Sequence, residues 1–338
     1  MDYSLCDVTF RLVCAPASRM PGVARILESL FVLTGPHHTA HRIDLIVNDA
    51  PETEVSGEVV FDAPGLTAIK TPRGYHLRAD ASFLAIDLPA GRAVGSLSDS
   101  FMYSPLEEQR GLFLFALLML LSRHGLYPLH AAGVWHAGCG FLLVGNSGSG
   151  KTSVTGALTR SGWHYLSDDS VLLRCGSQGV EAWAFGRQFH CAPAMLRHFP
   201  ELARHLRSPV IGKRLVDVSS VYPGQFRSRF RPRVILFPEI TPEPESCLIP
   251  LDSTATLVRL LGQGTGLLHS RESTAAQTAV LNHLARSAHG FRLLHGADVH
   301  RNPAHLAALL QRIANPGQDP EEQNHDQGDP IYAMHSAG

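Results

Sequence analysis

A glycine-rich stretch at residues 145–152 carries the residue types that bind phosphate groups. It reads Gly-Asn-Ser-Gly-Ser-Gly-Lys-Thr and so has the Gly-x-x-x-x-Gly-Lys-Thr spacing in full. Glycine lets a backbone approach phosphate oxygens closely and turn its amides towards them. The stretch therefore predicts a phosphate-binding loop, and an incidental glycine-rich turn is the alternative interpretation.

In such a loop the lysine reaches the outer phosphates of a nucleotide and the next hydroxyl binds magnesium. Lys151 and Thr152 stand at these two positions. A helix that begins at the loop would add the positive end of its dipole beneath the anion. The expected cofactors are ATP and Mg²⁺, and the expected cofactor-binding residues are Gly145, Asn146, Ser147, Gly148, Ser149, Gly150, Lys151, Thr152 and Ser153.

Two neighbouring carboxylates follow the loop. Asp168 and Asp169 come just after Trp163–Leu166, a strand-like run. Adjacent residues that leave a strand point to opposite sides, so one carboxylate could face the γ-phosphate and the other the metal. Phosphoryl transfer uses a proton acceptor together with an acid that orients the metal. The alternative is an ordinary solvated turn.

A second strand-like run, Val234–Phe237, also precedes an acidic residue. There, however, Pro238 occupies the position of the metal-binding carboxylate and Glu239 comes only after it. Proline has no group that binds a metal. The acidic function is therefore assigned to Asp168 and Asp169.

The elements around the loop must present it at the end of a strand. Phe141–Val144 is a continuous apolar run, typical of a strand buried on both faces. The stretch Lys151–Thr159 is helical in character, Ser161 and Gly162 end it, and Trp163–Leu166 returns to a strand. This order of strand, loop, helix and strand is the context in which phosphate loops occur.

The rest of the chain suggests three parts. Residues 1–125 alternate strand-like runs with turns and end in an apolar helix, for which Ser104 and Glu107 have the spacing of a capping box. Residues 126–315 contain the loop and its strands, and the polar residues 316–338 are typical of a disordered tail. We therefore predict an N-terminal accessory domain, a catalytic domain and a tail with these boundaries.

Composition and charge argue against several kinds of partner. Hydrophobic residues make up 44% of the 338 residues, and 29 Lys plus Arg balance 30 Asp plus Glu, so no net field draws in nucleic acid or an anionic membrane. The longest apolar run, Leu112–Leu121, is shorter than the roughly 20 residues that span a bilayer. The six cysteines lack Cys-x-x-Cys spacing, and no signal sequence is evident. We expect a cytoplasmic protein with no nucleic-acid or membrane partner, and a homo-oligomer stays open.

Three segments, taken together, resemble the catalytic domain of bacterial HPr kinase/phosphorylase and its relatives, which include peptide-serine kinases encoded with lasso-peptide biosynthesis genes. They are His130–Val134, Phe141–Thr152 and Gly162–Asp169. The resemblance implies an α/β fold: a P-loop kinase core of the HPr kinase / phosphoenolpyruvate carboxykinase type, here with an N-terminal α/β accessory domain. It also implies ATP and magnesium as cofactors and transfer of phosphate to a serine hydroxyl.

The resemblance further implies roles for single residues. Lys151 and Thr152 match the loop lysine and hydroxyl of the family, and Asp168 and Asp169 match its paired aspartates. The first aspartate is then the expected base, and Thr152 and Asp169 are the expected magnesium ligands. His130 matches a family histidine near the aspartates, whereas a core histidine at a strand start is the alternative. The expected catalytic residues are Asp168, Asp169, His130 and Lys151.

Two departures favour the divergent, peptide-kinase-like branch of the family. Residues 181–187 read Glu-Ala-Trp-Ala-Phe-Gly-Arg where HPr kinases carry Glu-Ile-Arg-Gly-Leu-Gly, and residues 1–125 do not match the HPr-kinase N-terminal domain. The expected function is an ATP-dependent kinase acting on a hydroxyl, with a serine of a peptide or small protein as the leading acceptor. The alternatives are a nucleotide-dependent adaptor without phosphotransfer and a small-molecule kinase acting on a sugar or polyol.

Overall fold

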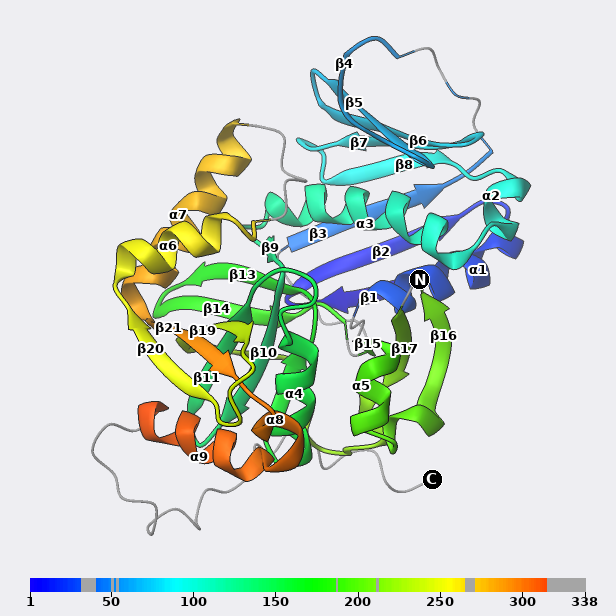
Figure 1. The fold of residues 1–338 in the computed structure, drawn as a ribbon. Coiled ribbons are helices and arrows are strands. Elements are labelled where there is room, and N and C mark those ends of the chain that lie inside the picture. The colour runs from blue at the N-terminus through cyan, green and yellow to red at the C-terminus, as the bar shows by residue number, and fades with distance from the viewer. Residues whose placement is uncertain are drawn as a thin grey trace, which may run out of the picture.

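The computed structural model describes residues 1–31, 41–49, 52, 55–186, 188–210, 213–264 and 271–314, without the side chains of residues 206–210, 213, 214, 271 and 272. The disordered tail predicted for residues 316–338 lies outside these ranges. Within them the chain is a mixed α/β protein with several sheets (Figure 1).

The N-terminal part of the chain is built on one large sheet. Its described strands form an eight-stranded sheet in the order β1-β2-β3-β8-β7-β6-β5-β4. Strands β2, β3 and β8 are parallel, whereas β4 to β8 form an antiparallel meander. The strands are β1 (Asp2–Leu5), β2 (Val8–Cys14), β3 (His41–Val47), β4 (Glu58–Ala63), β5 (Leu66–Thr71), β6 (Gly74–Ala79), β7 (Ser82–Asp87) and β8 (Arg92–Ser96).

Three helices accompany this sheet. They are α1 (Met20–Leu30), which the short 3₁₀ helix η1 (Ala17–Arg19) precedes, α2 (Asp99–Tyr103) and α3 (Leu106–Ser122). Helix α3 packs against β6, β7 and α1. Its sequence is apolar nearly all round, which is why it is buried along most of its length.

The predicted capping box of this apolar helix is wrong. Helix α3 begins at Leu106, after Pro105, and no side chain caps it. Ser104 instead follows the last residue of α2, where its hydroxyl donates to the carbonyl of Phe101 at 2.9 Å. The hydroxyl that should have capped α3 is therefore used at the end of the preceding helix.

The C-terminal part is built on three smaller sheets in the described residues. Their orders are β12-β10-β11-β19-β21-β20, β18-β14-β13-β9 and β15-β17-β16. The strands are β9 (Tyr127–Leu129), β10 (Ala131–His136), β11 (Cys139–Val144), β12 (His164–Ser167), β13 (Val171–Gly176), β14 (Gly179–Ala184), β15 (Gln188–Cys191), β16 (Leu206–Val210), β17 (Lys213–Asp217), β18 (Arg229–Phe230), β19 (Pro232–Ile240), β20 (Cys247–Leu251) and β21 (His289–His295). The helices are α4 (Lys151–Arg160), α5 (Pro193–His198), η2 (Leu202–His205), η3 (Val218–Ser220), α6 (Ser253–Leu261), α7 (Arg271–Ser287), α8 (Asp298–Arg301) and α9 (Pro303–Ala314).

The strand, helix and second strand predicted around the loop are present. Strand β11 is buried at every residue, as its apolar run predicts, and it pairs in parallel with β19. Helix α4 follows the loop and packs against β10. Strand β12, however, is not the neighbour of β11, because β10 lies between them and is antiparallel to both.

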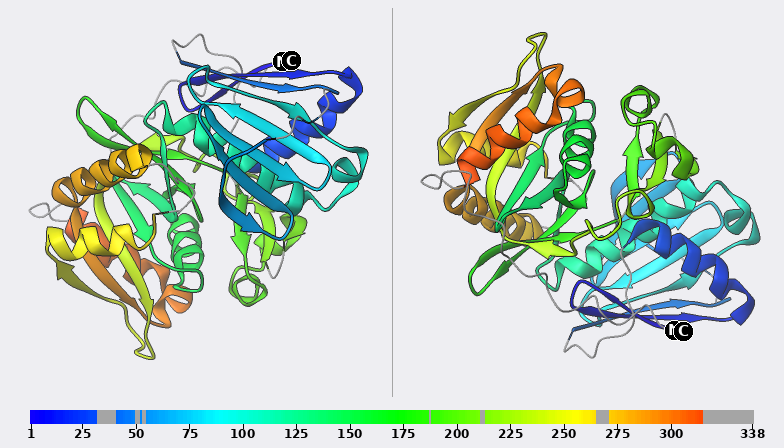
Figure 2. Two further views of the ribbon diagram at one scale, coloured as in Figure 1. Left: turned by 90° about the horizontal axis from the view of Figure 1, so that it is seen from above. Right: turned by 90° about the horizontal axis from the view of Figure 1, so that it is seen from below.

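The N-terminal and C-terminal parts pack closely together. One hydrophobic cluster extends from the N-terminal sheet through α3 to β9, β13, β14 and α7, and a second surrounds α4 and α9. Figure 2 shows the N-terminal sheet, blue to cyan, beside the C-terminal layers. Side chains of α1 and α3 are thereby held near the end of β12. Among the described helices, none combines the length and the hydropathy needed to cross a membrane.

Candidate functional site

The loop between β11 and α4 takes a shape that depends on its glycines. Gly148 has φ +86° and Gly150 has φ +93°, in the left-handed region that favours glycine. A Cβ on Gly150 would overlap the imidazole of His295, whose Cε1 would lie 2.5 Å away, whereas no atom of the described residues lies within 4 Å of a Cβ on Gly148. The loop is therefore tightly packed at one end and open in its middle.

The start of α4 offers unpaired hydrogen-bond donors. No side chain caps this helix, and the amides of Thr152 and Ser153 donate to none of the residues that the structure describes. The hydroxyl of Ser149 is also buried, and it has no hydrogen-bond partner within the described ranges. Free amides at a helix N-terminus bind phosphate groups. The residues present thus fit the phosphates of a nucleotide.

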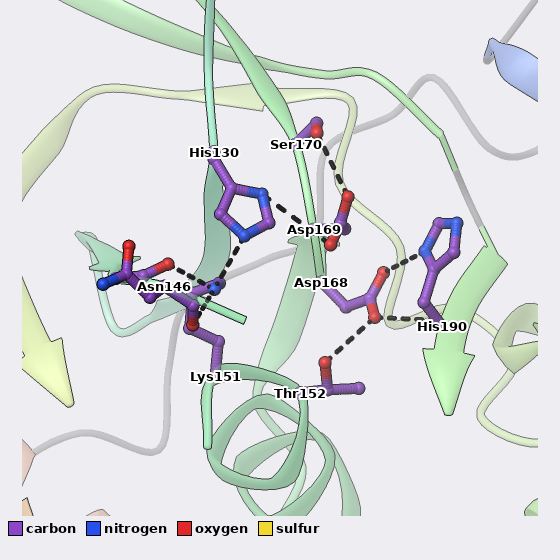
Figure 3. A network of polar contacts seen from close by, with 9 residues as sticks. His130, Asn146, Lys151, Thr152, Asp168, Asp169, Ser170 and His190 are labelled. Carbon is purple, nitrogen blue, oxygen red and sulfur yellow. Dashed lines mark hydrogen bonds and ion pairs between the residues drawn. The ribbon is translucent and has the colours of Figure 1, made fainter. Parts of the chain in front are cut away.

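Lys151 bends back over the loop towards His130 (Figure 3). Its ammonium group donates to the carbonyls of Gly145 and Asn146 and lies 3.0 Å from His130 Nε2. An ammonium group can only donate, so Nε2 is the acceptor and the ring proton resides on Nδ1. That Nδ1 lies 3.7 Å from Asp169 Oδ1. Lysine, histidine and aspartate therefore form one line of contacts beside the loop.

Asp168 follows β12, and its side chain is buried against Thr152 at the beginning of α4. Its side chain has no exposed surface, and its Oδ2 accepts hydrogen bonds from the Thr152 hydroxyl at 3.2 Å and the His190 amide at 2.7 Å. Its Oδ1 lies 3.3 Å from His190 Nδ1. Burial lowers the pKa of His190, but the charges of Asp168 and Asp169 outweigh it and leave that pKa raised. His190 is thus suited to pair with Asp168 as a cation.

Asp169 points to the other side of the chain, as the alternation after a strand predicts (Figure 3). Its side chain is 31% exposed, and it accepts a hydrogen bond from the Ser170 hydroxyl at 3.3 Å. It also lines a cavity of about 310 Å³ that lies between α1 and α3 on one side and the β12–β13 turn on the other. Of the two aspartates, Asp169 is therefore the one that a second substrate could reach.

The side-chain oxygens of Thr152 and its neighbour Asp168 fit a magnesium ion that is bound together with a nucleotide. The described residues contain no group of three or more His, Cys, Asp or Glu that could hold a metal ion. Magnesium, however, usually takes one or two protein oxygens and completes its shell with phosphates and water. The Thr152 hydroxyl and the Asp168 carboxylate, 3.2 Å apart, supply such oxygens.

Glu239, the acidic residue that was not assigned to the metal, has a different role. It lies near the end of β19 and pairs with Arg292 at 2.6 Å and Arg259 at 3.1 Å. These two ion pairs neutralise its charge. They also hold α6 and β21 against β19.

Three residues near the loop, the aspartates or the cavity could not be predicted from the sequence. His190 lies in β15, His295 ends β21 and lies 2.9 Å from the Ser149 carbonyl through its Nε2, and Arg110 on α3 lines the cavity. Each is an isolated residue in an ordinary strand or helix. Only the packing of distant elements brings them to the site.

Comparisons with known proteins give a structural likeness but no sequence match. No protein-family model matches the chain, and no curated protein matches it. Among solved structures the chain is similar to the Hpr(Ser) kinase/phosphatase from Coxiella burnetii, with a TM-score of 0.32 and 11% identity, over 55% of this chain and 89% of that chain. A likeness of this size does not establish a family.

Proposed function

We propose that the chain is an ATP-dependent phosphotransferase with a P-loop kinase core, which transfers the γ-phosphate of ATP to a hydroxyl group. One observation carries the proposal. Asp168 accepts a hydrogen bond from Thr152, while the adjacent Asp169 connects through His130 to Lys151. An incidental glycine-rich turn would not require two aspartates and a histidine next to its lysine and its threonine hydroxyl.

In this proposal the loop amides, the start of α4 and Lys151 bind the phosphates. Lys151 would leave the carbonyls of Gly145 and Asn146 for the phosphate oxygens, which are the stronger partners for an ammonium group. Thr152 and Asp168 would hold Mg²⁺. Magnesium bound there would neutralise charge that develops on the phosphates during transfer.

The positions of the two aspartates favour a division of roles opposite to the one that the resemblance implies. Asp168 has no exposed surface and contacts Thr152, so it suits the metal. Asp169 is partly exposed and lines the cavity, so it suits an acceptor hydroxyl. We assign proton acceptance to Asp169, with His130 Nδ1 orienting its carboxylate.

One candidate acceptor is a serine of a peptide or small protein, as we expect from the sequence. The cavity beside Asp169 favours a second candidate, a small-molecule hydroxyl. Its volume of about 310 Å³ is near the lower end of small-molecule sites, which begin at roughly 300 Å³.

The test is to incubate the purified chain with γ-labelled ATP, magnesium and a lysate fractionated into proteins, peptides and metabolites. Wild type and the exposed-lysine control Lys70→Ala should label one fraction, and Lys151→Ala should not. The labelled fraction identifies the class of acceptor. Binding of ATP without transfer to any fraction would refute phosphotransfer and favour the adaptor.

A further inference from the structure

The cavity beside Asp169 is formed by both parts of the chain. Glu28, Ser29 and Leu30 at the end of α1, Phe31 just after it, and Arg110 and Leu114 on α3 form one wall. Asp169 and His190 belong to the opposite wall. The N-terminal part therefore supplies one wall of a cavity that opens onto the proposed base.

Arg110 brings a positive charge to this cavity. It is half-buried, and among the described residues its guanidinium has no hydrogen bond or ion pair. Burial lowers the pKa of Arg110, and the charges of Glu107 and Asp169 act against that effect. Arginine nevertheless stays charged in proteins. A half-buried guanidinium with unused donors is a binding group for an anion.

The other charges around the cavity select the kind of anion. Among the described lining residues, Glu28, Asp169 and Asp217 carry carboxylates and His190 carries a positive charge when protonated. The carboxylates outnumber the two positive groups, Arg110 and His190, so the lining repels a doubly charged phosphate group more than a singly charged carboxylate. Both a carboxylate and a phosphate can bind a guanidinium through two oxygens, so charge, and not geometry, separates the two. Ser29 and Ser170 add hydroxyls to the lining, which suits a polar ligand.

We infer that this cavity is the acceptor site and that it takes a small hydroxy acid, whose carboxylate binds Arg110 and whose hydroxyl faces Asp169. The inference rests on the proposed phosphotransfer. In the reaction, Asp169 accepts the hydroxyl proton, the acceptor oxygen forms a bond to the γ-phosphorus, and ADP leaves with the electrons of the broken bond. Residues 1–125 then recognise the acceptor.

The first experiment measures binding without transfer. D-glycerate and glycerol are the probes, because they differ by a carboxylate in place of a hydroxymethyl group. Saturation-transfer NMR should detect glycerate on the wild type and on Arg123→Ala, an exposed arginine that follows α3. Arg110→Ala should lose the signal, and Ser29→Tyr, which fills the cavity from α1, should lose it as well. ATP affinity should be the same in all four proteins.

The second experiment measures transfer from ATP to glycerate, to glycerol and to the neutral peptide acetyl-Gly-Ser-Gly-amide. Glycerate should be preferred, and Arg110→Ala should raise its KM by about ten- to a hundred-fold, the usual effect of losing a charged hydrogen bond, with kcat little changed. A lowered kcat at unchanged KM would overturn the inference, because Arg110 would then act on the transferred phosphoryl group.

The remaining outcomes separate the inference from the proposed function. Equal use of glycerol or the peptide, or transfer of phosphate to another acceptor without any glycerate binding, overturns the inference and leaves phosphotransfer standing. The protein could bind glycerate in a way that depends on Arg110 and yet never transfer phosphate. That outcome would support the hydroxy-acid site and overturn phosphotransfer. Absence of both glycerate and ATP binding overturns both.

Discussion

Replacing Gly150 by alanine should destabilise the chain for two separable reasons. Gly150 has φ +93° and ψ 4° at the start of α4, and this left-handed conformation costs a residue with a side chain about 1–2 kcal/mol. A Cβ there would also overlap the His295 ring, with Cε1 2.5 Å away, and such overpacking costs about 1–3 kcal/mol. We expect Gly150→Ala to lower the free energy of unfolding by about 2–5 kcal/mol.

A double variant separates the two contributions. In the His295→Ala background the overlap is removed but the backbone strain remains, so Gly150→Ala should cost only about 1–2 kcal/mol. Gly148→Ala is the matched control, because Gly148 has nearly the same backbone, φ +86°, and its Cβ position has no atom of the described part of the chain within 4 Å. Urea unfolding of the wild type and the four variants, followed by circular dichroism, gives each free energy.

An equal cost of Gly150→Ala with and without His295 would refute the predicted overlap. A cost of Gly148→Ala as large as that of Gly150→Ala would refute it as well. Either result would mean that His295, which lies 2.9 Å from the Ser149 carbonyl, does not pack against the loop in the way the structure indicates. ATP affinity of the same variants would then show whether the loop needs this support to bind phosphate.

Two further predictions concern the groups around the aspartates. Asp168→Asn should raise the magnesium concentration needed for ATP binding about ten- to a hundred-fold. Asp169→Asn should leave ATP binding unchanged and slow phosphate transfer by about 10²–10⁴-fold. Equal loss of ATP binding in both variants would contradict the division of roles between the two aspartates. Because the folded-state pKa of His190 is raised, its contribution to stability is full below its unfolded pKa of about 6.5 and is lost as pH rises through the folded value. Unfolding free energies measured from pH 5 to pH 9 should therefore fall more steeply in the wild type than in His190→Gln, and parallel curves would count against the ion pair with Asp168.

The local features of the site could be predicted from sequence because their signals are local. The glycine spacing fixes where the backbone turns, and Gly148 and Gly150 do have positive φ. The apolar run Phe141–Val144 has the composition of a strand buried on both faces, and β11 is buried throughout. Adjacent side chains after a strand must diverge, and Asp168 and Asp169 do so.

The predicted capping box shows where local reasoning fails. Ser104 and Glu107 have the right spacing, but a short helix ends just before Ser104 and uses its hydroxyl. A spacing rule cannot decide between two neighbouring helix ends that compete for one side chain. Their relative stability depends on what each helix packs against.

The sequence by itself thus determined the loop, its strand and helix, and the acidic pair, because glycine conformation, apolar burial and strand alternation act over a few residues. Only the tertiary structure decided which distant groups join them. His190 meets Asp168 across 22 residues, His295 meets Ser149 across 146, and Arg110 reaches the cavity from another sheet's helix. Strand order and packing between layers set these contacts, and a single histidine or arginine in a strand or helix leaves no periodic trace of its partner.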